Sequence, residues 1–119
     1  MSLTVDTEQR GGVVVVSVGG ELDMATAPQL QDQISDLLEK GRTRLVFDLA
    51  QVSFCDSTGL SVFVRAKNST DDAGGVVRLA APQRGVRRIL EVSGLVEVLH
   101  TYPTVDEAVT ADASEPAAG

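Results

Sequence analysis

Apolar and polar residues alternate along the chain with a period that changes several times, and each change predicts a new element. Leu3 and Val5 alternate with polar residues, which predicts a half-buried strand. The triplet Arg10-Gly11-Gly12 predicts a hairpin turn into a second strand, Val13 to Val18. This strand is almost all valine, as expected for a strand with neighbours on both sides. The pair Gly19-Gly20 is predicted to end it.

A helix is predicted to follow, because the next apolar residues have helical spacing. Thr26-Ala27-Pro28-Gln29 has the residue types of a capping box with proline in the first turn. Gly41 is placed to end the helix in the left-handed conformation. The core-facing stripe is predicted to be Leu30, Ile34, Leu37 and Leu38.

The middle of the chain combines a buried strand with a second helix. Arg44 to Leu49 is a short apolar run and predicts the strand. From Leu60 onward, Phe63 and Val64 continue the spacing of a helix whose inner face packs on a sheet. Residues 56–59, which are Asp56, Ser57, Thr58 and Gly59, are therefore expected at the first turn of this helix.

The last third of the chain predicts two more strands and two more helices. Val76 to Ala80 is predicted to be a strand after the break at residues 71–75. Pro82 precedes a helix that ends at Gly94. Val96, Val98 and Leu99 are predicted to form a short last strand, and Thr104 to Glu107 has the pattern of a second capping box. In the third helix the inward residues are predicted to be Val86, Ile89 and Leu90.

The predicted order is β-β-α-β-α-β-α-β-α in a single α/β domain. This order predicts a mixed β-sheet with an N-terminal hairpin, followed by alternating helices and parallel strands. Residues 1–112 are expected to form the domain and residues 113–119 a disordered C-terminal tail. If the strands before Asp23 and before Ser57 are parallel neighbours, the two loops lie side by side at one sheet edge.

Composition narrows the classes of partner. The formal net charge of −7 argues against a direct nucleic-acid partner, because such proteins bind phosphates through Lys and Arg. The chain has neither an apolar run long enough for a membrane span nor a signal peptide, so no membrane association is predicted. Cys55 is the single cysteine and has no internal disulfide partner. These features together predict a cytoplasmic protein.

Most catalytic chemistries lack the residues that they require. A serine hydrolase needs a base to activate its nucleophile, and the single histidine, His100, lies at the end of a predicted strand, where a histidine is more often a surface or packed residue. Ser57 also lacks the Gly-x-Ser-x-Gly sequence of a hydrolase nucleophile. The glycine pairs match no nucleotide-binding loop, and no cysteine and histidine cluster suggests a metal. We therefore predict no catalytic residue, no cofactor and no metal site.

Asp48 lies at the end of a predicted strand, so an alternative is a domain phosphorylated on aspartate, as in response-regulator receivers. That chemistry needs an acidic pair for Mg²⁺ and a lysine on the last strand, whereas the lysines are Lys40 and Lys67. Asp48 is therefore predicted to be structural. The basic residues of the third helix leave two readings open, a docking patch or a solvated surface: Arg84, Arg87 and Arg88.

The first turn of the second helix carries the most specific signal. Backbone N–H groups there lack helical partners and the helix dipole favours negative charge, so a phosphate is accommodated at low cost. A plain alternative is that Asp56 or Ser57 only caps the helix. The segment Asp56-Ser57-Thr58-Gly59-Leu60, with the apolar run before it, resembles the phosphorylation segment of anti-sigma-factor antagonists built on the STAS domain. Residues 20–23 and 25–28 resemble a second recurring segment of that family, and nearly the whole chain fits its element order.

The resemblance implies a switch between partners. Similar proteins bind an anti-sigma-factor serine kinase when unphosphorylated, which frees the sigma factor, and the kinase then phosphorylates their serine. Here the acceptor is expected to be Ser57, with Asp56 and Gly59 shaping its turn, Asp23 on the adjoining binding surface, and Thr58 as a second hydroxyl that stays open. A phosphoserine phosphatase is the expected third partner.

Two other functions remain open. STAS-like domains also serve as scaffolds without a switch or as modules associated with transporters. This chain shows no membrane-spanning segment, and a scaffold without phosphorylation would not need a hydroxyl at position 57. Ser57 could also be the nucleophile of a small enzyme, in which case acyl esters would acylate it.

Overall fold

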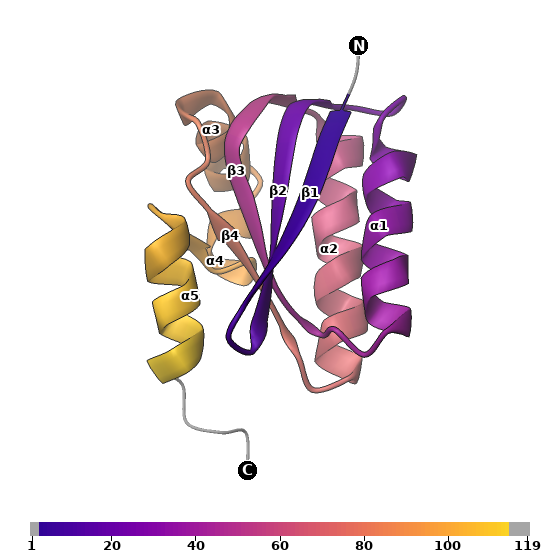
Figure 1. The fold of residues 1–119 in the computed structure, drawn as a ribbon. Coiled ribbons are helices and arrows are strands. Elements are labelled where there is room, and N and C mark those ends of the chain that lie inside the picture. Colours follow the sequence, from indigo (N-terminus) through magenta and orange to yellow (C-terminus); the bar gives the residue numbers. More distant parts are fainter. Residues whose placement is uncertain (1–2, 115–119) are drawn as a thin grey trace.

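The chain folds as a mixed five-stranded sheet with several helices on one face and helix α5 (Val105–Ser114) on the other (Figure 1). The structure is a computed structural model that describes residues 3–114. The strand order is β1-β2-β3-β4-β5, with β1 antiparallel to β2 and the other neighbouring pairs parallel. This confirms the predicted α/β fold with its N-terminal hairpin. The elements are β1 (Leu3–Arg10), β2 (Val13–Leu22), α1 (Ala27–Glu39), β3 (Arg44–Cys55), α2 (Ser57–Asp72), β4 (Val76–Ala80), α3 (Arg84–Val92), α4 (Leu95–Val98), β5 (Thr101–Tyr102) and α5 (Val105–Ser114).

The sheet buries a core on each face. On one face α1, α2 and α3 pack over the larger core, in which the rings of Phe47 and Phe63 meet edge to face at 5.1 Å. On the other face lies α5 (Figure 1). Its Ala108 belongs to the smaller core together with Val15 and Val46. Because β3 lies at the centre and is covered on both faces, its first half is a nearly continuous apolar run.

Several predicted boundaries are confirmed. Arg10 pairs with Val13 across a two-residue turn, in which Gly11 has a φ of 63°. Gly41 ends α1 with a φ of 79°, and the predicted stripe of that helix faces the core, with Leu38 partly buried at its margin. The strand predicted at residues 76–80 has the same limits in the structure.

Strands β2 and β3 are both longer than predicted. The pair Gly19-Gly20 does not end β2, which continues to Leu22 through two register shifts. β3 continues past Leu49 to Cys55 and pairs with this extension. A side chain on Gly19 would lie 2.7 Å from Thr4 Oγ1, so the glycine permits close strand packing here and does not act as a terminator.

The predicted capping box of α1 is wrong in its hydrogen bonds. Thr26 precedes the helix, but its hydroxyl donates to the Glu21 carbonyl at 2.7 Å and accepts from the Asp23 N–H at 3.0 Å. The Gln29 amide donates to the Leu3 carbonyl on β1. Thr26 is buried beneath the loop, so its hydroxyl satisfies loop backbone groups in preference to the helix N–H groups.

The predicted strand at Val96, Val98 and Leu99 is also wrong, because this segment forms the short helix α4. Leu99 is buried and Val96 is partly buried, whereas Val98 is exposed. That is the i, i+3 spacing of a helix and not the alternation of a strand. The last strand is instead β5, which pairs in parallel with the end of β4.

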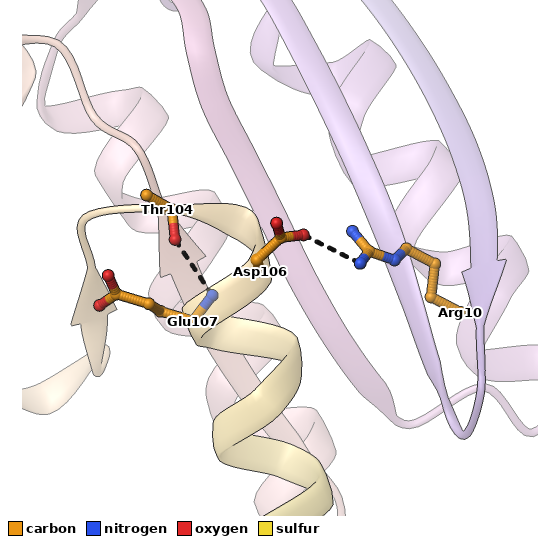
Figure 2. A network of polar contacts seen from close by, with 4 residues as sticks. All are labelled: Arg10, Thr104, Asp106 and Glu107. Carbon is orange, nitrogen blue, oxygen red and sulfur yellow. Dashed lines mark hydrogen bonds and ion pairs between the residues drawn. The ribbon is translucent and has the colours of Figure 1, made fainter.

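At the C-terminal end, two polar contacts stabilise the start of α5 and its packing beside the hairpin (Figure 2). Thr104 Oγ1 accepts from the Glu107 N–H at 3.1 Å, as predicted for the start of this helix. Asp106 pairs with Arg10 of the hairpin at 3.0 Å. The helix runs to Ser114 and so enters the segment predicted to be a tail, of which residues 115–119 lie outside the described residues.

Candidate functional site

The carboxyl ends of β2 and β3 bring the two predicted loops to one edge of the sheet. Leu22 and Cys55 are register partners at the ends of these parallel strands. The Asp56 N–H donates to the Leu22 carbonyl at 3.2 Å and so joins the two loops directly. The loop that carries Asp23 and the start of α2 therefore lie side by side, as the sequence predicted.

Asp56 caps α2 and leaves Ser57 on the surface. Asp56 Oδ1 accepts from the Gly59 N–H at 3.0 Å, and the Asp56 carbonyl accepts from the Leu60 N–H at 3.0 Å. Ser57 is the first residue of the helix and is exposed, whereas Thr58 is half-buried. Because Asp56 supplies the cap, the Ser57 hydroxyl is not required for it.

Gly59 is buried where α2 approaches the end of β2. A Cβ at this position would lie 2.8 Å from Leu22 Cγ, 2.9 Å from Cys55 Sγ and 2.9 Å from the Leu22 carbonyl oxygen. All three distances are shorter than real Cβ contacts, and one of the atoms is backbone. Gly59 thus fixes how closely the first turn of α2 packs on the two strand ends.

Asp23 organises its own loop. Its Oδ1 accepts from the N–H groups of Ala25 and Thr26 at 2.9 and 3.1 Å and from the Thr26 hydroxyl at 3.3 Å. The side chain of Met24, at the tip of this turn, is 75% exposed. Asp23 therefore stabilises the loop conformation in which Met24 is exposed. From the sequence, Asp23 was predicted only to lie on the binding surface.

Ser57 lies on the border of two surface hollows. The first, the α1–α2 groove, has a volume of about 480 Å³ and is lined by residues that include Met24, Asp32, Ser57, Thr58 and Arg65. The second, the α2–α3 depression, has a volume of about 350 Å³ and is lined by Ser57, Leu60, Arg88, Ile89, Val92 and Ser93. Of the predicted site residues, only Ser57 borders both hollows.

Met24 and Val92 are the surface residues that sequence reasoning missed. Val92 is 80% exposed, and it lies off the predicted apolar stripe of α3. Met24 follows the predicted strand in a polar loop. In each case the available signal was an apolar residue at a position that the pattern assigned to solvent. Val92 adjoins Leu60 and Ile89 in the α2–α3 depression, and contiguous exposed apolar surface of this kind is typical of a protein interface.

The residues considered for other chemistries do not join Ser57. His100 follows α4, and its carbonyl accepts a hydrogen bond from the Leu79 N–H on β4. Leu79 is the register partner of Phe47 on β3, and Phe47 lies eight residues before the end of that strand. Eight residues of strand span roughly 26 Å, so His100 is remote from Ser57. Among the described residues no group of three or more His, Cys, Asp and Glu is arranged to hold a metal ion.

Asp48 and the lysines take structural roles. Asp48 Oδ1 accepts from the Ala50 N–H at 3.1 Å within β3. Lys40 pairs with Asp36 at the end of α1, and Lys67 pairs with Asp71 along α2. These contacts agree with the prediction that Asp48 is structural.

Burial raises the pKa of the Cys55 thiol to about 12, and the nearby Asp56 carboxylate adds to the shift. The neutral thiol is thus favoured in the folded protein. Between pH 9 and 12 the folded state retains a proton that the unfolded state has lost, so the free energy of unfolding falls as the pH rises through this range.

We expect native Cys55 to resist alkylation by iodoacetamide at pH 8 and to react fully once the protein is unfolded. Mass spectrometry after timed alkylation gives the measurement. Alkylation of the native protein at the rate of a free thiol would contradict the burial and the raised pKa.

Within the described part of the chain, no helix is sufficiently long and apolar to cross a membrane.

Comparison with known proteins agrees with this geometry. Residues 4–108 match the family model of the STAS domain. The anti-sigma-F factor antagonist RsfB of Mycobacterium tuberculosis is 32% identical over 111 residues, which are 92% of this chain and 88% of that protein. The anti-sigma-B factor antagonist of Staphylococcus aureus is 29% identical, over 84% of this chain and 93% of that protein.

A solved structure extends the likeness to three dimensions. The crystal structure of an anti-sigma factor antagonist from Mycobacterium paratuberculosis superposes with a TM-score of 0.85 at 36% identity, covering 92% of this chain and 93% of that one. The chain therefore belongs to the STAS domain family, among the anti-sigma factor antagonists.

Proposed function

We propose that this antagonist works by switching partners at Ser57. In the unphosphorylated state it binds an anti-sigma-factor serine kinase and thereby releases a sigma factor. Phosphorylation of Ser57 by that kinase ends the binding, and a phosphoserine phosphatase restores it. The observation that carries the proposal is the exposure of Ser57 at the capped start of α2, between two hollows bordered by exposed Met24 and Val92.

The contacts at the start of α2 explain why a phosphate there would not unfold the domain. Ser57 is exposed, so the phosphate enters solvent and not the core. Phosphorylation adds about −1.5 to −2 charge beside the N–H groups and the positive dipole end of α2. The Asp56 cap and the Gly59 contacts beneath it involve no Ser57 side-chain atom.

The same charge is unfavourable at an interface. A partner that covers Met24 and Val92 also covers Ser57, because each of these apolar residues lines a hollow that Ser57 borders. The phosphate would then have to lose its water at the interface, which costs several kcal/mol for a buried ion. The carboxylate of Asp56, the residue before Ser57, repels the phosphate as well. Binding is therefore lost while the fold is kept.

Ser57 is favoured over Thr58 as the acceptor on two physical grounds. Ser57 is exposed, whereas Thr58 is half-buried and faces only the α1–α2 groove. A serine hydroxyl on the rim of both hollows is the more accessible nucleophile for a kinase active site. We also propose that the protein acts in the cytoplasm and has no catalytic activity of its own.

We expect a cognate kinase with Mg²⁺ and ATP to add one phosphate to the protein, on Ser57. Ser57→Ala should take up none and should still bind the kinase, because Asp56 and not Ser57 caps the helix. Site-resolved mass spectrometry and kinase affinity are the two measurements. Thr58→Val is the matched control and should be phosphorylated like the wild type. Phosphorylation mainly on Thr58, or full phosphorylation of Ser57→Ala, would show that the acceptor is wrong.

A further inference from the structure

Arg88 lies on the side of α3 that faces the start of α2. The neighbouring residues Val86 and Leu90 are buried in the core, which directs Arg88 toward the surface. Its side chain lines the α2–α3 depression together with Ser57. The other lining residues are apolar or neutral, so Arg88 is the one charged residue of this hollow.

The three arginines of α3 differ in their surroundings. Arg87 pairs with Glu91 one turn along the same helix, with Nε and Oε2 3.6 Å apart. Arg84 is exposed at the start of the helix and lines neither hollow. Among the side chains that the structure describes, none forms an ion pair with Arg88. Its guanidinium is therefore available to an anion that arrives at Ser57.

We propose that Arg88 binds the phosphate of phosphorylated Ser57 across the α2–α3 depression. The inference rests on the proposed function and assigns a specific residue to the phosphorylated state. A guanidinium presents paired donors that match phosphate oxygens, so one arginine can hold a phosphate in a defined direction. The ion pair would lie over Leu60, Ile89 and Val92, on the apolar surface that an unphosphorylated partner covers.

The α1–α2 groove offers the competing cation, Arg65. This groove also contains the carboxylate of Asp32, which repels a phosphate and offsets the charge of Arg65. On the α3 side no acidic residue lines the hollow. Asp56 lies beside Ser57 in the chain and repels the phosphate whichever way it turns. The balance of charges therefore directs the phosphate toward α3.

The test installs phosphoserine at position 57 by suppression of an amber codon, so that no kinase is needed. The second ionisation of phosphoserine has a pKa of about 6, which phosphorus NMR follows as a chemical-shift titration. We expect Arg88→Gln to raise this pKa by about half a unit, since an exposed ion pair favours the dianion by an amount of that size. Arg88→Lys keeps the charge and should give an intermediate value.

Controls on the same helix isolate the effect. Arg87→Gln and Arg84→Gln remove the same charge from α3 and should shift the phosphate pKa by much less. The difference between Arg88→Gln and the wild type should shrink in 1 M NaCl, where the screening length is about 3 Å.

Two results would overturn the assignment. Equal pKa values in the wild type and Arg88→Gln would show that the phosphate does not contact Arg88. A larger rise in Arg65→Gln than in Arg88→Gln would place the phosphate in the α1–α2 groove. Failure of a kinase to modify Ser57 would count against the proposed function alone, because the phosphoserine in this experiment does not come from a kinase.

Discussion

Gly59→Ala should lower the free energy of unfolding by about 1–3 kcal/mol and the melting temperature by roughly 5–15 °C. The added methyl group would meet Leu22 and Cys55 side chains and the Leu22 carbonyl oxygen, all closer than 3.0 Å. The backbone oxygen cannot move without disturbing the hydrogen bond from the Asp56 N–H. The first turn of α2 must therefore shift away from the strand ends, and Ser57 shifts with it. Thermal and urea denaturation supply the measurement.

Gly85→Ala is the matched control for this substitution. Gly85 also lies in the first turn of a helix, and apart from its chain neighbours and the backbone of its own helix no atom would lie within 4 Å of its new methyl group. Alanine favours helix over glycine by up to about 1 kcal/mol, so this variant should be unchanged or slightly more stable. If Gly59→Ala were as stable as Gly85→Ala, the close contact of α2 with β2 would not exist as described.

Met24→Asp and Val92→Asp should each weaken binding to the cognate kinase by roughly 10- to 100-fold, while the melting temperature stays nearly constant. Both side chains are largely exposed, at 75% and 80%, so the folded protein loses little packing. In a complex that covers Ser57 they would be buried, and a carboxylate there would have to lose its water. The few residues that dominate a protein interface each contribute about 2 kcal/mol or more, and 2 kcal/mol corresponds to roughly 30-fold in affinity. Calorimetry or surface plasmon resonance with the unphosphorylated protein gives the affinity.

Val98→Asp is the control for charge introduced at an exposed apolar residue. Val98 is 46% exposed on α4 and lines neither the α1–α2 groove nor the α2–α3 depression. Its substitution should leave the affinity within about twofold of the wild type. A loss equal to that of Met24→Asp would mean that net charge, and not contact at the two hollows, controls binding. Unchanged affinity in both Met24→Asp and Val92→Asp would remove these hollows from the interface.

The amino-acid sequence by itself determined the element order and most of the core. Apolar spacing reports which face of a helix or strand is buried, and this local signal identified Leu30 and Ile34 in α1 and Val86 and Leu90 in α3. The left-handed turn at Gly41 was also predictable, because few residues other than glycine adopt that conformation. The same local chemistry pointed to the start of α2, where an Asp before a Ser-Thr-Gly sequence supplies a cap and an exposed hydroxyl.

The tertiary structure decided where local signals were ambiguous. Gly19 and Gly20 are expected to break an isolated strand, but they pair with β1 on one side and with β3 on the other. Pairing with β3 alone then carries β2 on to Leu22. The segment at residues 95–98 has a high strand propensity, yet burial of Leu99 and Val96 is achieved by a helix. Thr26 has the residue type of a helix cap, but once the loop is packed its hydroxyl serves Glu21 and Asp23.

The neighbourhood of Ser57 belongs to the tertiary structure as well. Met24, Ser57 and Arg88 are far apart in the chain, and parallel pairing of β2 with β3 together with packing of α3 beside α2 brings them to one edge of the sheet. Spacing along a sequence carries no record of such contacts, because they depend on which strands become neighbours and how closely a helix approaches them. Gly59 sets how closely α2 approaches the strands. The need for a glycine is visible only from the atoms that a Cβ at this position would meet.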